Sequence, residues 1–327
     1  MTMIRAARFG AGALAGTLVF LAFVSSAAAA ETPKVVVTIK PVHALVSQIM
    51  GGVGTPTLLV AGSASPHTFT LRPSTARAIN DADVFIRVSD TMEPFTRKIV
   101  KSLPSSVDVL TLTEAPGVAL LDQRHGGTFE PHTHGHSAGA EHEDHDDHDE
   151  DGKDGHIWLD PQNAKAIVAI VTKTLVARYP EYAGKFTANA AALDQRLDAL
   201  NRELTTELSG ARSKPFIVFH DATQYFENRF GLSAAGSITV SPDVPPSARR
   251  LTEVRHKIAS LGAVCVFSEP SFQPKLVAAV TEGTQARAGT LDAEGQMLTP
   301  GPELYFDLMR GLAHNLASCL NTEERRG

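Results

Sequence analysis

The segment from Asp122 to His156 contains eight of the thirteen histidines of this 327-residue chain, mixed with acidic residues. Eleven acidic residues stand against two basic ones, so the segment has a formal charge of −9. It has almost no apolar side chain to bury and cannot build a hydrophobic core. Imidazoles suit zinc, copper and nickel, and carboxylates add oxygen ligands and attract cations. We therefore expect a disordered, metal-binding loop at about 122–155; the alternative is a purely solvated linker.

The acidity of the chain is local. The formal net charge is −6, so the residues outside this segment sum to +3. A local acidic cluster points to cations as the partner. No basic stripe with interleaved aromatic residues is present, so we expect no nucleic-acid partner.

The first thirty residues have the pattern of a secretory signal peptide. Arg5 and Arg8 precede an apolar run over 11–24 that is too short to span a bilayer stably. Small residues follow, with an A-x-A pattern that places the cleavage after Ala30. No cysteine lies near this point, which predicts that the chain has no lipid anchor. We expect a soluble protein exported to the periplasm.

The chain has two cysteines, Cys265 and Cys319. An oxidising compartment favours a disulfide between them, which would tie the end of the chain back to its second half. The alternative is a pair of buried free thiols.

Strand-like runs such as KVVVTI and DVFIRV alternate with helical patterns along the chain, among them one that predicts a helix over 92–101. This alternation predicts an α/β fold with mostly parallel sheets flanked by helices. The longest helical pattern runs over 182–208, roughly 40 Å at 1.5 Å per residue, which is longer than a crossover helix needs. We therefore expect a signal peptide at 1–30, an N-terminal lobe at 31–180, a linking helix at 181–210 and a C-terminal lobe at 211–327.

Three isolated histidines, His67, His156 and His220, stand at expected transitions from strand to helix. In open α/β sheets, ligands bind beyond the carboxyl ends of the strands. Three imidazoles there can converge on one tetrahedral ion that takes a fourth ligand. Asp292, at the end of the run AGTLD, is the candidate fourth ligand, and water or Glu269 is the alternative.

The other three isolated histidines, His43, His256 and His314, lie within helical patterns. Their neighbours are apolar or charged, so we expect surface or core positions for them rather than a role in the metal site.

Five motifs in order, GSASPHTFTLRPS, HIWLDPQNA, VFHDATQYF, VFSEPSFQP and TLDAEGQ, resemble the zinc receptors of bacterial ABC importers. These are the ZnuA-type members of the cluster A-I, or TroA-like, solute-binding proteins. The resemblance spans nearly the whole mature chain and implies two α/β lobes joined by a rigid long helix, with the metal in the cleft. The family's three ligand histidines match His67, His156 and His220. Its aspartate in an LDP-type motif matches Asp292, although Ala293 replaces the proline.

The resemblance implies a periplasmic receptor that captures Zn²⁺ and delivers it to an ABC permease with its cytoplasmic ATPase. We expect a monomer without enzymatic activity. The family also often pairs cysteines placed like Cys265 and Cys319. Manganese-binding relatives tend to carry a carboxylate at the position of His220, so histidine there favours zinc.

Three other functions remain open at this point: a secreted zinc hydrolase, a manganese receptor of the same family, and an adhesin or metal buffer that uses the histidine-rich loop alone. A hydrolase could use Glu269 as its base, but the chain has neither an H-E-x-x-H nor a G-x-S-x-G motif.

Overall fold

A computed structural model describes the chain over residues 32–124, 129, 152–239, 246–270 and 274–321. The chain from Thr32 onward forms one compact unit. The predicted signal peptide and most of the predicted histidine-rich loop lie outside the described residues. Within the described part, no helix is long and apolar enough to cross a membrane.

The first half contains a sheet of four parallel strands in the order β2-β1-β3-β4. The strands are β1 (Val35–Val37), β2 (Thr57–Leu58), β3 (Val84–Arg87) and β4 (Asp108–Thr111). Parallel neighbours require crossover connections. Those between the first three strands contain the helices α1 (Lys40–Ile49) and α2 (Pro73–Asn80), and α3 (Arg97–Val100) lies between β3 and β4.

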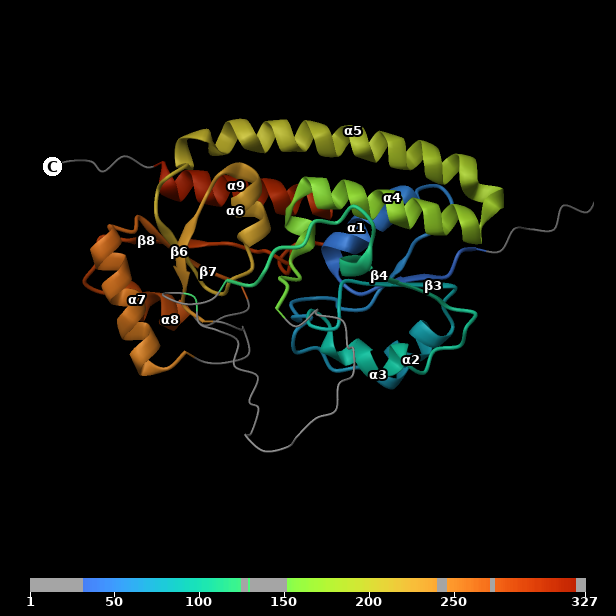
Figure 1. The fold of residues 1–327 in the computed structure, drawn as a ribbon, viewed down its shortest axis with the longest axis horizontal. Helices are drawn as coiled ribbons and strands as arrows, with labels where there is room; N and C mark the ends of the chain where they lie inside the picture. The colour runs from blue at the N-terminus through green and yellow to red at the C-terminus, as the bar shows by residue number, and fades with distance from the viewer. Residues whose placement is uncertain (1–31, 125–128, 130–151, 240–245, 271–273, 322–327) are drawn as a thin grey trace, which may run out of the picture. The chain divides into compact units, whose positions relative to one another are not determined.

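The second half repeats this strand order, β6-β5-β7-β8, again with every pair parallel. Its strands are β5 (Phe216–Val218), β6 (Ala234–Ser237), β7 (Cys265–Ser268) and β8 (Arg287–Thr290). The helices between them are α6 (Gln224–Phe230), α7 (Ala248–Leu261) and α8 (Pro274–Thr281). The predicted α/β fold with two parallel sheets is therefore confirmed (Figure 1).

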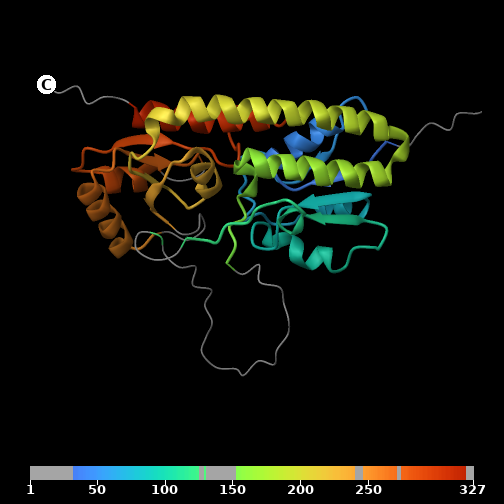
Figure 2. The same ribbon diagram turned by 45° about the horizontal axis from the view of Figure 1, so that its top comes forward.

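Three longer helices pack beside the sheets: α4 (Pro161–Arg178), α5 (Ala183–Glu207) and α9 (Leu304–Leu320). Helix α4 begins where Pro161 supplies a fixed backbone angle and the Asp160 side chain accepts the Gln162 N–H. Helix α5 has 25 residues and contacts α1 and α4 from the first half and α9 from the second. Figures 1 and 2 both show it running alongside α4 and α9. The long helix predicted from the pattern over 182–208 is confirmed, one residue inside each end of that pattern.

The alternation of side chains along each strand divides the core. Val35 and Val37 face a large hydrophobic cluster, whereas Val36 faces a smaller one beside α2 and α3. In the second sheet, Phe216 belongs to the same large cluster and Ile217 to a third one beside α7 and α8. The large cluster also contains the buried face of α5, so it is continuous through both halves.

A disulfide joins Cys265, at the start of β7, to Cys319, near the end of α9. The predicted pairing is confirmed, and the alternative of two free thiols is wrong. The bond fastens the last described helix to the second sheet.

The segment predicted as one helix over 92–101 is instead a 3-10 turn (Pro94–Thr96) followed by the short α3. Pro94 has no N–H to donate. The Glu93 carboxylate turns inward, where it accepts the backbone N–H groups of Val88 and Ser89. No sequence pattern predicts α6, β6 and β8, because each is short and the two strands contain mostly small residues.

Candidate metal centre

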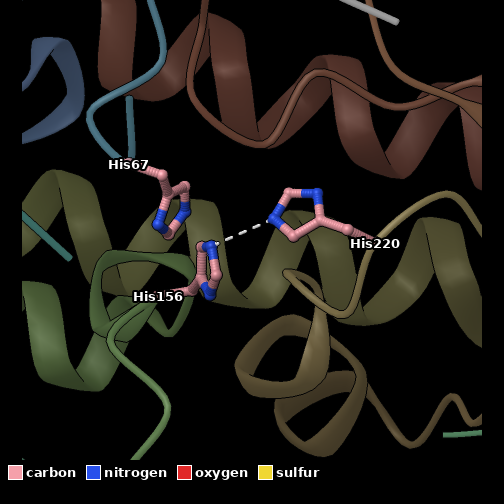
Figure 3. Close-up of side chains that lie close together, drawn as sticks. All are labelled: His67, His156 and His220. Carbon is pink, nitrogen blue, oxygen red and sulfur yellow. Dashed lines mark hydrogen bonds between the residues drawn. The ribbon is translucent and has the colours of Figure 1, made fainter. Parts of the chain in front are cut away.

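Three histidine side chains from separate loops meet at one point (Figure 3). His67 lies between β2 and α2, His156 precedes the 3-10 helix Ile157–Leu159, and His220 follows β5. One ring nitrogen of each lies within 4.8 Å of the others. His156 and His220 are buried and His67 is partly buried. The structure therefore brings together the three histidines predicted to converge, and we call them the three-histidine site.

Asp154 orients His156. Its Oδ1 accepts the His156 backbone N–H at 3.0 Å and lies 2.7 Å from Nδ1 of the ring. Gly155 lets the backbone between them pass close to Met92, because a Cβ at position 155 would lie 3.1 Å from Met92 Cε. When Nδ1–H donates to the carboxylate, Nε2 is left to face the other histidines.

Glu269 orients His220 in the same way. The two residues follow the adjacent parallel strands β5 and β7. Oε1 of Glu269 lies 2.5 Å from Nδ1 of His220 and accepts its backbone N–H at 3.2 Å. Glu269 was an alternative fourth ligand from the sequence, but its Oε1 contacts the histidine instead.

The spacing of the ring nitrogens suits a metal ion. Nε2 of His156 lies 3.3 Å from Nε2 of His220. Tetrahedral zinc with Zn–N bonds of 2.0–2.1 Å places its ligand nitrogens about 3.3 Å apart. With both Nδ1–H groups directed at carboxylates, two Nε2 lone pairs would face one another. Either a proton on one ring or a cation between the rings removes that repulsion.

Charge at the site favours a cation. Burial alone lowers the pKa of His220, but the charge of Glu269 and its hydrogen bond outweigh burial and raise the pKa to about 9. Burial raises the pKa of Asp154 to about 7, against the opposing hydrogen bond from the His156 N–H. Near neutral pH without an ion, His220 therefore holds a proton directed at His156, and a metal ion must displace it.

Arg124 ties the first half of the chain to the second beside this site. Its Nε lies 2.9 Å from Oδ2 of Asp221, and its Nη1 lies 2.7 Å from Oε2 of Glu227. The neighbouring Gln123 N–H donates to the Gly152 carbonyl at 2.7 Å. The two described stretches that flank the histidine-rich segment therefore pair with each other beside the three-histidine site.

Asp292, the predicted fourth ligand, is not brought into the three-histidine site. Its Oδ1 accepts the Gln296 N–H at 2.8 Å, and its Oδ2 accepts the Met297 N–H at 2.9 Å. The turn that these bonds close requires a left-handed residue, and Gly295 provides it with φ of 67°. The carboxylate is therefore directed into its own turn.

Another carboxylate in the same turn is closer. Oε1 of Glu294 lies 4.0 Å from Nε2 of His67, and its Oε2 accepts a hydrogen bond from Gln296 Nε2 at 2.8 Å. Burial raises the pKa of Glu294 to about 7. Sequence reasoning missed both Glu294 and Asp154. The only signals were an acid two positions from a candidate ligand, in TLDAEGQ and in DGH.

The remaining isolated histidines lie elsewhere, as expected. His43 is buried, with Nε2 3.0 Å from the Pro56 carbonyl oxygen. His256 is exposed on α7, and the His314 side chain is 73% exposed on α9.

The family model described as zinc-uptake complex component A, periplasmic (ZnuA), matches residues 35–319. The chain belongs to the ZnuA family. Two relatives share the name high-affinity zinc uptake system protein ZnuA. The one from Brucella abortus (strain 2308) is 49% identical over 320 residues, covering 92% of this chain and 96% of the relative. The one from Paracoccus denitrificans is 39% identical over 321 residues, covering 90% and 94%.

Solved structures share the fold of this ZnuA-family chain. The periplasmic zinc-binding protein TroA from Treponema pallidum superposes with a TM-score of 0.73 at 22% identity, over 89% of this chain and 99% of TroA. A mutant of the laminin-binding adhesin Lmb from Streptococcus agalactiae gives 0.71 at 26% identity, over 88% and 99%. The resemblance to ZnuA-type, TroA-like receptors read from the motifs is confirmed.

Proposed function

We propose that this chain is the periplasmic receptor of an ABC-type zinc importer. It captures Zn²⁺ at the three-histidine site and delivers it to a membrane permease with a cytoplasmic ATPase. The observation that carries the proposal is the convergence of three imidazoles, one ring nitrogen from each lying within 4.8 Å of the others. The names of the relatives, high-affinity zinc uptake proteins, support the same cargo.

The ligand type favours zinc over manganese. Imidazole suits zinc, whereas carboxylate, carbonyl and water oxygens suit manganese. Asp154 and Glu269 each meet the Nδ1 side of a ring. Such outer carboxylates set the tautomer and raise the basicity of a ligating imidazole.

A receptor fits the site better than a hydrolase does. A zinc hydrolase needs a general base within reach of a metal-bound water. Glu269 was the base considered from the sequence, and its Oε1 accepts the backbone N–H and contacts Nδ1 of His220. We further propose that the protein is a monomer without catalytic activity or nucleic-acid partner, exported after cleavage near Ala30 and free of a lipid anchor.

The test is zinc titration of metal-free protein against a chelator of known affinity. Single His67→Ala, His156→Ala and His220→Ala variants should each lose the tight site, with Kd raised at least about 100-fold. Loss of an outer-shell partner alone costs about 10- to 100-fold, and loss of a ligand should exceed that. His314→Ala is the matched control, because the residue is exposed on α9. All variants keep the histidine-rich segment, so tight binding that survives in all three would refute the site.

The preference for zinc over manganese is tested by the same titration of metal-free wild-type protein. Wild-type protein should bind Zn²⁺ far more tightly than Mn²⁺, because its expected ligands are mainly nitrogen. Equal or tighter binding of Mn²⁺ would favour the manganese receptor instead.

A further inference from the structure

We propose that Glu294 is the fourth ligand of the ion held at the three-histidine site, so that zinc is bound by three imidazoles and one carboxylate. This inference rests on the zinc-binding function proposed above. It moves the ligand role two residues along the chain from Asp292, the position indicated by the sequence motif.

Asp292 already has a structural role that uses both carboxylate oxygens. The two oxygens accept the N–H groups of Gln296 and Met297 at 2.8 Å and 2.9 Å. Aspartate commonly closes turns through such side chain to backbone bonds. Turning Asp292 toward the ion would leave these two amides without their acceptor and would open the turn.

Glu294 needs little movement to reach the ion. A tetrahedral site with Zn–N bonds of 2.0–2.1 Å and Zn–O bonds of 2.0–2.2 Å places a ligand oxygen about 3.4 Å from a ligand nitrogen. Oε1 of Glu294 lies 4.0 Å from Nε2 of His67, which is about 0.6 Å more than such a site requires. The residue is 8% exposed, so its carboxylate is removed from bulk water.

The backbone on each side of Glu294 is tied to the first half of the chain. Trp158 Nε1, two residues after His156, donates to the Ala293 carbonyl at 2.9 Å. Lys40 Nζ, at the start of α1, donates to the Gly295 carbonyl at 3.0 Å. Glu294 is thus held between two anchored peptide groups. From the second half of the chain it faces His67, the expected ligand from the first half.

The side chain keeps room to adjust. Oε2 is held by Gln296 Nε2, while Oε1 is the oxygen nearest His67. Glu294 also lines a small cavity together with Lys40 and Pro66, so one side of the residue borders open space. Rotation about the last bonds of the side chain would bring Oε1 toward the ion while the backbone of the turn stays in place.

The experiment compares Glu294→Gln, which keeps shape and removes charge, with Asp292→Asn and with His67→Ala. Each metal-free protein is titrated with Zn²⁺ against a chelator. Each is then loaded with less than one equivalent of Co²⁺, whose visible absorption reports the ligand set of the tightest site. Glu294→Gln should raise the zinc Kd at least about tenfold, the lower end of the cost of losing an outer-shell partner. It should also shift the Co²⁺ bands, and by more than Asp292→Asn does, because the asparagine keeps one oxygen to accept a turn N–H.

Three results would overturn the assignment. Zinc affinity of Glu294→Gln equal to the wild type would mean that the carboxylate contributes nothing. A weaker affinity with unchanged Co²⁺ bands would mean that it acts only through its charge. Altered bands in Asp292→Asn but not in Glu294→Gln would assign the ligand to Asp292. The His67→Ala arm separates these from failure of the proposed function, because unchanged tight binding in that variant removes the three-histidine site itself.

Discussion

Zinc binding should be limited by the proton on His220. The pKa of this ring is raised to about 9, because the charge of Glu269 and its hydrogen bond outweigh the effect of burial. The ligand must be neutral to bind the ion, so protons compete with zinc below that pKa. At pH 7, two units lower, the apparent Kd should be about 100-fold above its high-pH limit. That factor corresponds to about 2.7 kcal/mol.

The sign of the effect follows from the direction of the shift. The proton is held below about pH 9 and lost above it. Zinc affinity should therefore rise about tenfold per pH unit between pH 7 and pH 9 and then level off. Chelator competition at several pH values measures the slope. Calorimetry in buffers of different ionisation enthalpy measures the release of about one proton per zinc at pH 7.

Replacing Glu269 by Gln tests the cause. The amide oxygen can still accept from Nδ1 and the backbone N–H of His220, but the charge is gone. The charge of Glu269 no longer opposes burial, so the pKa of His220 should fall and proton release at pH 7 should diminish. Glu303→Gln, at an exposed position, is the matched control. A wild-type affinity that stays flat from pH 7 to pH 9, with no proton release, would refute this reasoning.

Three further outcomes are expected. Asp154→Asn should weaken zinc binding about 10- to 100-fold with unchanged circular dichroism, because it disturbs the partner of the His156 ring; unchanged affinity would remove that role. Replacing Cys265 and Cys319 together by Ala should lower the free energy of unfolding in urea by about 4 kcal/mol, from a chain-entropy model for a separation of 54 residues. Arg124→Met should lower it by about 3 kcal/mol, because two largely buried carboxylates lose their partner; unchanged unfolding midpoints would contradict either stability prediction.

The fold was predictable because its signals are local. Alternating apolar strands and helical patterns predicted two parallel sheets, and the apolar spacing over 182–208 predicted α5 to within one residue at each end. Short elements of small residues, such as β6 and β8, carry no such signal and form only because neighbouring strands pair with them. The helix expected over 92–101 is replaced by a three-residue 3-10 turn and the four-residue α3, since Pro94 and the inward Glu93 side chain outweigh the helical spacing.

The sequence by itself determined which residue types are available for the metal: three isolated histidines, each beside a recognisable motif, and an aspartate in TLDAEGQ. A motif records order along the chain but not the direction of a side chain. Only the tertiary structure decided that Asp154 and Glu269 face the far side of two imidazoles and that Asp292 closes a turn. It also placed Glu294 opposite His67. The Asp154 and Asp292 bonds are local, but no periodic pattern marks them. The contacts of Glu269 with His220 and of Glu294 with His67 join residues far apart in sequence, so they form only when the chain is folded.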